Sequence, residues 1–337
     1  MVRTPAMLWF WLGFFALVAV LLFLDLGVLH RKAKEPTLKS AAWWTAGWVA
    51  LGLSFTGVVY LLYAGAETGD SFIVRDRYSA ASGSEAAFTY VSAYLLEQAL
   101  SVDNIFVISL LFHSFRIPTK YQHRVLFWGI LGAIVFRVIM LAGGAFLAHR
   151  FDWVFYVFGA YLAYQGIKLL RGGDEDPDEE RGLAVRMLRR VVRVVDGDYG
   201  GRFTVTVDGR RALTTVAVCL VVIELTDVVF ALDSIPAVLS VSKDTFIMIT
   251  SNIFAIMGLR SLYFVLAGAM SQFRYLKIAL AVLLILIGAK MFSHNFFTIS
   301  HQLSLALIAG IIATGVIASL IANRRDAVEH DAPPPGP

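Results

Sequence analysis

Long apolar runs separated by short polar segments extend over almost the whole chain. Since a helix needs about 20 apolar residues to cross the hydrocarbon core of a bilayer, runs of this length predict membrane-spanning helices. The pattern predicts an all-α, polytopic membrane protein with about nine such helices. Their expected ranges are 6–29, 39–64, 87–113, 121–148, 152–170, 212–239, 244–269, 275–292 and 302–322.

Acidic residues interrupt two of these runs. Residues 95–111 read LLEQALSVDNIFVISLL, and residues 221–239 read VVIELTDVVFALDSIPAVL. A charged carboxylate at the centre of a membrane helix costs about 2.5–3.5 kcal/mol on insertion scales. We therefore expect these side chains to face a protein interior, a water-filled cavity or a cation. The candidate metal-binding residues are Glu97, Asp103, Asn104, Glu224, Asp227, Asp233 and Ser234.

The two acidic runs resemble each other, and the similarity continues into the spans that follow. In the fourth span Arg137 precedes LAGG, and in the seventh span Arg260 precedes LAGA. The fifth span ends in GIKLL and the eighth in GAKMF. A unit of three spans places the following unit in the opposite orientation, which is the inverted repeat found in many secondary transporters. The alignment pairs Glu97 with Asp227, Asp103 with Asp233 and Asn104 with Ser234.

The repeat divides the chain into five parts. Residues 87–170 hold the first unit, with helices three to five, and residues 212–300 hold the second unit, with helices six to eight. Residues 1–86 carry two peripheral helices and an outer loop. Residues 171–211 form a cytoplasmic insert, and residues 301–337 carry the ninth helix and a disordered tail.

The insert has a composition of its own. Its arginines predict a basic amphipathic helix that lies on anionic lipid. The alternating stretch FTVTVDGRR, with Asp208-Gly209 near its end, predicts a short hairpin. The arginines of the predicted helix are Arg186, Arg189, Arg190 and Arg193.

The overall composition excludes a soluble protein. Hydrophobic residues make up 58% of the 337 residues and charged residues only 16%, whereas about a quarter of the residues of a soluble domain are charged. Cys219 is the single cysteine, which excludes an internal disulfide and a site with several cysteine ligands. The basic residues lie between the spans, which argues against nucleic acid as a partner.

The basic residues also predict the orientation in the membrane. Most of the 29 Lys and Arg fall on one side if the N-terminus lies outside. Because loops on the cytoplasmic side carry an excess of Lys and Arg, we expect the N-terminus outside and the C-terminus in the cytoplasm. The first apolar run has no cleavage site of the A-x-A type after it, so we expect it to remain as a helix.

The spacing of the acids limits how they can meet. On a regular helix, Asp103 lies about 120° around from Glu97, and the second run has the same spacing. A facing helix from the other unit would give each acid its own partner. A local break at Pro236 is the alternative, because proline has no N–H for the carbonyl of Leu232.

The donor set predicts the kind of cation. Carboxylate, amide, hydroxyl and carbonyl oxygens suit Mg²⁺, Ca²⁺ or Mn²⁺ better than copper or zinc. Met257 is interpreted as a packing residue rather than a soft ligand. Arg137 and Arg260 are interpreted as structural counter-ions. With Asp25 of the first span, six acids lie within the spans, so the two arginines leave four acids without a compensating charge. These four must be protonated, coordinated or hydrated.

Three stretches of the chain resemble a known family. EQALSVDN, ELTDVVFALDSIPA and SNIFAIMGLRSLYF resemble the TerC family of bacterial membrane proteins. The nine predicted spans and LDL at 24–26 are most similar to its Alx-like branch. The resemblance implies an exporter of divalent cations, chiefly Mn²⁺, related to the LysE-type transporters and linked to tellurite resistance. The motif positions are the seven candidate residues named above.

These observations lead to one main hypothesis. We expect a secondary transporter in the bacterial inner membrane that exports Mn²⁺, ahead of Ca²⁺ or Mg²⁺, by alternating access. The ion would bind in an acidic site near the midplane, and protons are the candidate coupling ion. No enzymatic activity and no resident cofactor are expected, and the oligomeric state stays open.

Two other classes of function were weighed. A membrane scaffold in the response to metal or tellurite stress would need no transport. An intramembrane enzyme, such as an aspartyl protease, would use two membrane acids. It would require a GxGD-like motif, which the chain lacks.

Overall fold

Helices make up most of the structure. The computed structural model describes residues 5–27, 37–64, 80–151, 153–171, 186, 192–195, 197–267, 275–292 and 300–330. A helix occupies each predicted apolar run. The elements are α1 (Pro5–Gly27), α2 (Leu38–Tyr63), α3 (Gly83–Ser114), α4 (Thr119–Arg150), α5 (Trp153–Leu170), β1 (Val194–Val195), β2 (Thr204–Val207), β3 (Arg210–Thr214), α7 (Thr215–Val241), α8 (Thr245–Met257), α9 (Leu259–Ala267), α10 (Leu276–Phe292) and α11 (His301–His330).

The predicted class, an all-α polytopic membrane protein, is confirmed. Within the described residues, five helices are long and apolar enough to cross a membrane, or six if α8 and α9 form one bent span. The number of nine spans and the inverted repeat stay predictions.

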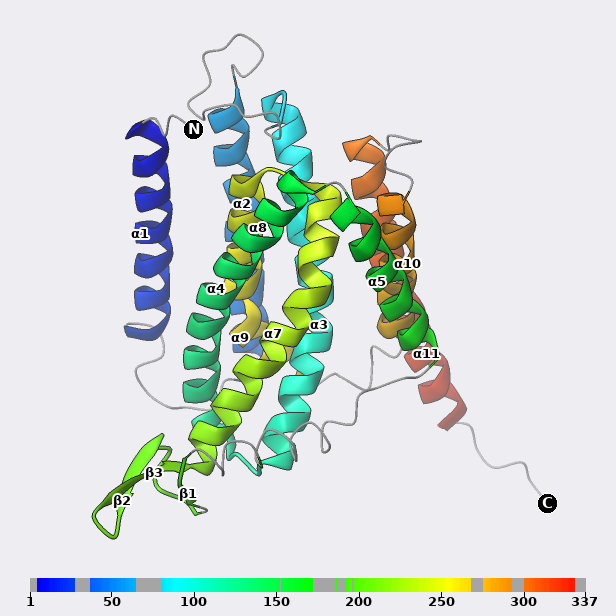
Figure 1. Ribbon diagram of the computed structural model, residues 1–337. Coiled ribbons are helices and arrows are strands. Elements are labelled where there is room, and N and C mark those ends of the chain that lie inside the picture. Colours follow the sequence, from blue (N-terminus) through cyan, green and yellow to red (C-terminus); the bar gives the residue numbers. More distant parts are fainter. Residues whose placement is uncertain are drawn as a thin grey trace, which may run out of the picture.

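The helices form a bundle with α3 and α7 near its centre (Figure 1). α3 and α7 start at opposite ends of the bundle, and α7 begins next to β3 (Figure 1), so these two helices are antiparallel. α3 also packs against α2 and α8, and α4 packs against α7. α1 lies at one edge, and α5, α10 and α11 lie together on the other side (Figure 1).

Buried charge and exposed apolar surface distinguish this bundle from a soluble protein. Glu97 on α3 is 0% exposed and Arg137 on α4 is 2% exposed. Ile139 and Phe146, also on α4, are 62% and 67% exposed. Lipid can cover such apolar side chains, whereas charged groups within membrane helices face the bundle interior. The expectation that Glu97 turns away from lipid is confirmed.

Glycines hold α5 close to α10. A Cβ added at Gly159 would lie 3.0 Å from the carbonyl oxygen of Gly288, and one at Gly288 would lie 2.6 Å from that of Gly159. A Cβ at Gly166 would lie 2.7 Å from the carbonyl oxygen of Ala281. Small residues allow such close backbone contact between membrane helices. α5 also contacts α7, so its close packing on α10 helps to position it beside α7.

The alternative of a local break at Pro236 is wrong. α7 is helical from Thr215 to Val241, with Pro236 inside it. Membrane helices tolerate proline because neighbouring groups and local adjustments satisfy the freed carbonyl. The chain bends instead at Gly258, where α8 and α9 meet at 45°. The acids must therefore be brought together by packing between helices.

The predicted hairpin in the insert is confirmed. β2 and β3 pair antiparallel, and Asp208 and Gly209 join them with φ of 53° and 71°. Positive φ at both positions is the requirement of a type I′ two-residue turn. The sequence did not predict β1, which pairs parallel with β3. β3 runs directly into α7, whose first turn is capped by the Thr214 hydroxyl.

The sheet packs against the start of α4. Arg124 donates to the carbonyl of Gly201 at 3.1 Å and lies over the ring of Phe203. The predicted arginine-rich helix lies mostly outside the described residues, because only Arg186 and Arg193 among its arginines are described. The outer loop at 65–79 and the tail at 331–337 also lie outside them.

Candidate functional site

A single arginine joins the two acidic helices. Arg137 of α4 donates from Nε to Oδ2 of Asp227 at 3.2 Å and from Nη2 to Oδ1 of Asp227 at 2.8 Å. Its Nη1 donates to Oε1 of Glu97. The planar guanidinium matches the two oxygens of Asp227 with parallel hydrogen bonds, which is the strongest form of such a pair. Arg137 thus binds a carboxylate from α3 and another from α7.

Asn104 completes this contact. With its amide in the orientation that satisfies both atoms, its oxygen accepts from Nη2 of Arg137 at 2.9 Å and its nitrogen donates to the carbonyl of Leu100 at 3.3 Å. Asn104 lies seven residues after Glu97, which is about two helical turns, so both lie on one face of α3. Glu97, Asn104, Arg137 and Asp227 are called the arginine cluster below.

The arginine cluster lies halfway along its helices. Glu97 is near the middle of α3, Arg137 near the middle of α4 and Asp227 near the middle of α7. At 1.5 Å per residue, each is roughly 18–27 Å from either end of its helix. This is the depth at which an unpaired charge would cost most, so pairing is the condition for keeping these residues charged there.

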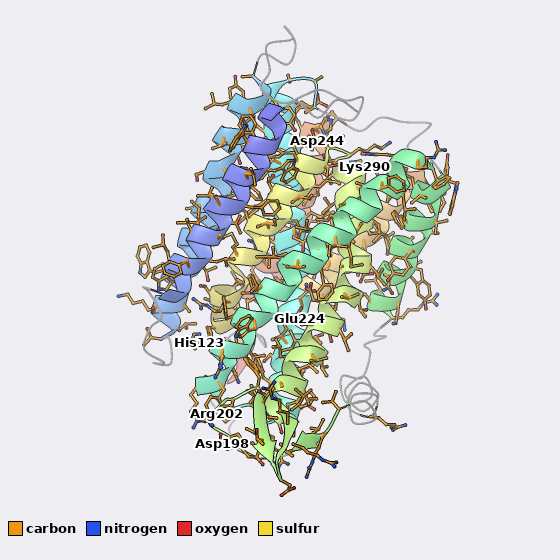
Figure 2. The ribbon with its side chains drawn as sticks, turned by 60° about the vertical axis from the view of Figure 1, so that its left-hand side comes forward. His123, Asp198, Arg202, Glu224, Asp244 and Lys290 are labelled. Atoms are coloured by element: carbon orange, nitrogen blue, oxygen red, sulfur yellow. The ribbon has the colours of Figure 1, made fainter. Side chains whose placement is uncertain are left out.

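Glu224 lies one turn before Asp227 on α7 and packs against α4. A Cβ added at Gly132 would overlap its carboxylate, so glycine at this position lets the carboxylate lie against α4 where it does. Oε2 of Glu224 is buried and has no hydrogen-bond partner. Figure 2 shows Glu224 between the end of the bundle with Asp244 and Lys290 and the end with Arg202 and Asp198. Glu224 is therefore a half-buried acid with one buried oxygen, and it lies beside the arginine cluster, not within it.

Asp233 lies about two turns further along α7 and contacts α5. Gln165 donates from Nε2 to Oδ1 of Asp233 at 3.1 Å and also to the hydroxyl of Tyr161 at 2.9 Å. Sequence reasoning missed Gln165. The available signal was its chemistry, because Gln165 is the one side-chain amide in the apolar run of α5. An amide in such a run needs a buried partner.

Several buried oxygens near the arginine cluster have no hydrogen-bond partner. They are Oε2 of Glu97 and the hydroxyls of Ser101 and Ser234. Ser101 lies one turn after Glu97 on α3, and Ser234 follows Asp233 on α7. A buried polar atom without a partner costs about 1–3 kcal/mol, so such atoms call for an explanation such as water or an ion. These oxygens are of the type that hard divalent cations prefer.

The predicted site residues therefore fall into separate places. Glu97, Asn104 and Asp227 come together at Arg137, while Glu224 and Asp233 lie one turn before and about two turns after Asp227. Asp103 belongs to α3, and its side chain lies outside the described residues. Among the described side chains, no three His, Cys, Asp or Glu are arranged to hold a metal ion.

The expectation that each acid meets its own partner on a helix of the other unit agrees with the second acidic run, where Asp227 binds Arg137 of α4 and Asp233 binds Gln165 of α5. Glu97 differs, because its partner Arg137 belongs to its own unit. Glu97 and Asp227, which the sequence alignment pairs, both bind Arg137. The interpretation of Arg137 as a counter-ion is confirmed by these contacts. Two carboxylates share one guanidinium, so the three charged groups together carry one negative charge. The assignment of the seven candidate residues to metal binding stays a prediction.

Comparisons with known proteins agree on the family. The model of the family "Integral membrane protein TerC family" matches residues 82–327. "Uncharacterized membrane protein STKORF319" of Myxococcus xanthus is 41% identical over 324 residues, 96% of each chain.

Two further relatives carry a different name. "Putative membrane-bound redox modulator Alx" is 38% identical over 325 residues in Escherichia coli strain K12, covering 96% of this chain and 97% of that protein. The protein of that name in Photorhabdus laumondii is 37% identical over 321 residues, covering 95% and 97%. No solved structure matches this chain. The chain belongs to the integral membrane protein TerC family, as the motifs of both acidic runs predicted.

Proposed function

We propose that this protein is a secondary transporter that exports a divalent metal ion, most favourably Mn²⁺, from the cytoplasm of a bacterial cell. The observation that carries the proposal is the arginine cluster. Its two carboxylates come from α3 and α7 and are buried halfway along both helices. Acids at this depth usually mark an ion or proton pathway.

The donor set supports a hard divalent cation. The side chains available there offer carboxylate, amide and hydroxyl oxygens. Four of these oxygens, on Glu97, Ser101, Glu224 and Ser234, are buried without a hydrogen-bond partner. Mn²⁺, Mg²⁺ and Ca²⁺ bind oxygen ligands of this kind. In the proposed site, Asp103 and Asp233 would hold the ion, and Glu97, Asn104, Asp227 and Ser234 would contribute further oxygens.

The course of the helices supports alternating access. α3 and α7 begin the two predicted units and run in opposite directions (Figure 1). In the predicted repeat, α7 is the counterpart of α3, α8 that of α4, and α10 that of α5. The first helix of each unit packs on the second helix of the other unit, because α3 packs on α8 and α7 packs on α4. The third helices, α5 and α10, pack on each other. Two inverted units around a central site can expose that site to each side in turn. The distribution of Lys and Arg supports a cytoplasmic C-terminus.

Proton exchange is the proposed coupling. An acid without a permanent basic partner can exchange a proton for a metal ion. Glu224, with a buried oxygen that has no hydrogen-bond partner, is the candidate proton acceptor. Under this proposal, an imposed pH gradient accelerates Mn²⁺ transport, and a rate that is indifferent to the gradient contradicts the coupling.

The test is Mn²⁺ transport by the purified protein in liposomes, with Mn content and growth under excess Mn²⁺ measured in cells. We expect Asp103→Asn and Asp233→Asn to lose most of the transport at matched expression. The control is Asp208→Asn, an exposed hairpin position at which asparagine tolerates the positive φ. Unchanged Mn²⁺ handling in both site variants would refute the proposal.

A redox role is the second candidate, because relatives carry the name of a membrane-bound redox modulator. Cys219 is the single cysteine and is fully buried in α7, so a thiol-based reaction would have to reach it there. Cys219→Ala separates the two functions. It should leave Mn²⁺ transport unchanged, and a loss of cellular function with intact transport would favour the redox role or a scaffold.

A further inference from the structure

Arg137 occupies oxygens of Glu97 and Asp227 that the proposed function assigns to the metal ion. It holds both oxygens of Asp227 and one oxygen of Glu97, and Asn104 accepts from the same guanidinium. Arg137 is 2% exposed, so water does not screen its charge from the carboxylates. A guanidinium keeps its charge at any physiological pH and cannot leave the site by losing a proton.

Resting on the proposed function, we infer that Arg137 is a tethered counter-ion that fills the cargo site when no metal is bound and moves away when a divalent cation binds. Glu97 and Asp227 carry two negative charges, which Arg137 reduces to one. A divalent cation in place of Arg137 neutralises both. A divalent cation beside Arg137 would exceed the charge of Glu97 and Asp227 by one, and the two cations would repel each other strongly in a buried site.

Glu224 is the carboxylate that can receive the displaced guanidinium. It precedes Asp227 by three residues on α7, so the two acids lie on nearly the same face, roughly one helical turn apart. A turn is about 5.4 Å, which is within the reach of an arginine side chain. Oε2 of Glu224 has no hydrogen-bond partner, and Gly132 leaves the room that its carboxylate occupies. The exchange thus moves Arg137 along α7 from Asp227 to Glu224.

This exchange gives Arg137 a role in release as well as in binding. A site of bare carboxylates would hold a divalent cation tightly and release it slowly. A tethered cation that returns to Asp227 competes with the metal ion and favours its departure. The structure-only alternative is that Arg137 merely holds α3, α4 and α7 together, in which case its removal would weaken metal binding.

The first test is the affinity for Mn²⁺ alone, measured on the full chain in nanodiscs by calorimetry. We expect Arg137→Gln to bind Mn²⁺ more tightly than the unmodified protein, on the order of 10-fold, because the competing charge is gone. Transport in liposomes should fall in the same variant. Arg124→Gln, on the same helix but beside the sheet, is the control and should leave both values unchanged.

Arg137→Lys covers the case in which Arg137→Gln does not fold. Lysine keeps the charge but cannot hold both oxygens of Asp227, so we expect an affinity between those of the unmodified protein and Arg137→Gln, with transport partly retained. Equal or weaker Mn²⁺ binding in both folded variants overturns the inference while leaving the proposed function in place. Failure of the unmodified protein to bind or move Mn²⁺ refutes the proposed function itself.

A double-mutant cycle tests the part played by Glu224. Glu224→Gln should weaken Mn²⁺ binding when Arg137 is present, because the guanidinium has nowhere to go. In the Arg137→Gln background the same change should have little effect, so the two effects are not additive. Equal weakening in both backgrounds would make Glu224 a direct metal ligand and would refute its role as the receiving group.

Discussion

Two ion pairs in this molecule have the same chemistry and the same length but lie in opposite environments. Nη2 of Arg137 lies 2.8 Å from Oδ1 of Asp227, and Nη2 of Arg193 lies 2.8 Å from Oδ2 of Asp208 in the sheet. The side chains of the first pair are 2% and 13% exposed, and those of the second pair are 45% and 76% exposed. The distance alone therefore says nothing about what either pair does.

The environment decides the energy of each pair. An exposed pair contributes about 0–1 kcal/mol, because water and salt screen it. Breaking a buried pair by removing one partner costs about 3–5 kcal/mol, because the other charge stays buried without a partner. The carboxylates of a buried pair need a cation beside them. Another cation that replaces the arginine meets the same need, so a buried pair can change between two states.

The largest expected effect is on the buried pair. Arg137→Gln should destabilise the metal-free protein by about 3–5 kcal/mol in detergent unfolding, because Glu97 and Asp227 lose their counter-ion. Added Mn²⁺ should restore more stability to this variant than to the unmodified protein, since a ligand stabilises the state that binds it. Arg193→Gln is the exposed control. Equal destabilisation in the two variants would contradict the comparison.

The next largest loss of stability is expected where the Glu224 carboxylate lies against Gly132 of α4. Gly132→Ala should destabilise the protein by about 1–3 kcal/mol and slow Mn²⁺ transport, because the new methyl group would overlap the Glu224 carboxylate. Gly143→Ala, on the same helix, is the matched control, because a Cβ there meets nothing within 4 Å. If the two variants unfolded at the same denaturant concentration, Glu224 would not be packed against Gly132.

A smaller effect on stability, which depends on pH, is expected at the contact between the sheet and α4. The pKa of Asp198 is lowered from its ordinary value of 3.8, first by the backbone N–H of Gly200, then by the hydroxyl of Tyr121 and by the charge of Lys120. A lowered pKa means that this contact contributes stability above pH 3.8 and loses it as the pH falls through the lower folded value.

Limited digestion with pepsin, which cleaves in acid, can follow this loss. We expect the loop at 197–202 of the unmodified protein to be cut faster as the pH falls below 3.8. In Asp198→Asn the rate of cutting should already be high at pH 4 and should change less. The same change of cutting rate with pH in both proteins would reflect pepsin alone and would show that Asp198 does not hold the loop in place.

The smallest effect is expected at the exposed pair. Arg193→Gln or Asp208→Asn should change the free energy of unfolding by less than about 1 kcal/mol, and 0.5 M salt should remove most of that change. Unfolding curves with and without salt measure it. A change that survives high salt would mean that this pair is more shielded from solvent than its exposure indicates.

The sequence alone determined the fold class, the family and which acidic residues lie within membrane helices. Apolar runs of about 20 residues have few stable forms other than helices in a bilayer, so the helix positions could be read from composition. The hairpin was also readable, because Asp208-Gly209 favours the positive φ of its turn. The cost of a charge in lipid identified Glu97, Asp227 and their neighbours without any coordinates.

Only the tertiary structure decided which acids share a partner. Helical spacing places Glu97 on a face of α3 but cannot say which helix covers that face. α7 packs against both α3 and α4, which brings Arg137 to both Glu97 and Asp227, and the packing of α5 against α7 brings Gln165 to Asp233. Only the structure shows that α7 stays helical through Pro236, because a membrane helix can tolerate a proline when its surroundings satisfy the freed carbonyl. A local pattern is set by residues close in the chain, whereas these contacts depend on helices far apart in it.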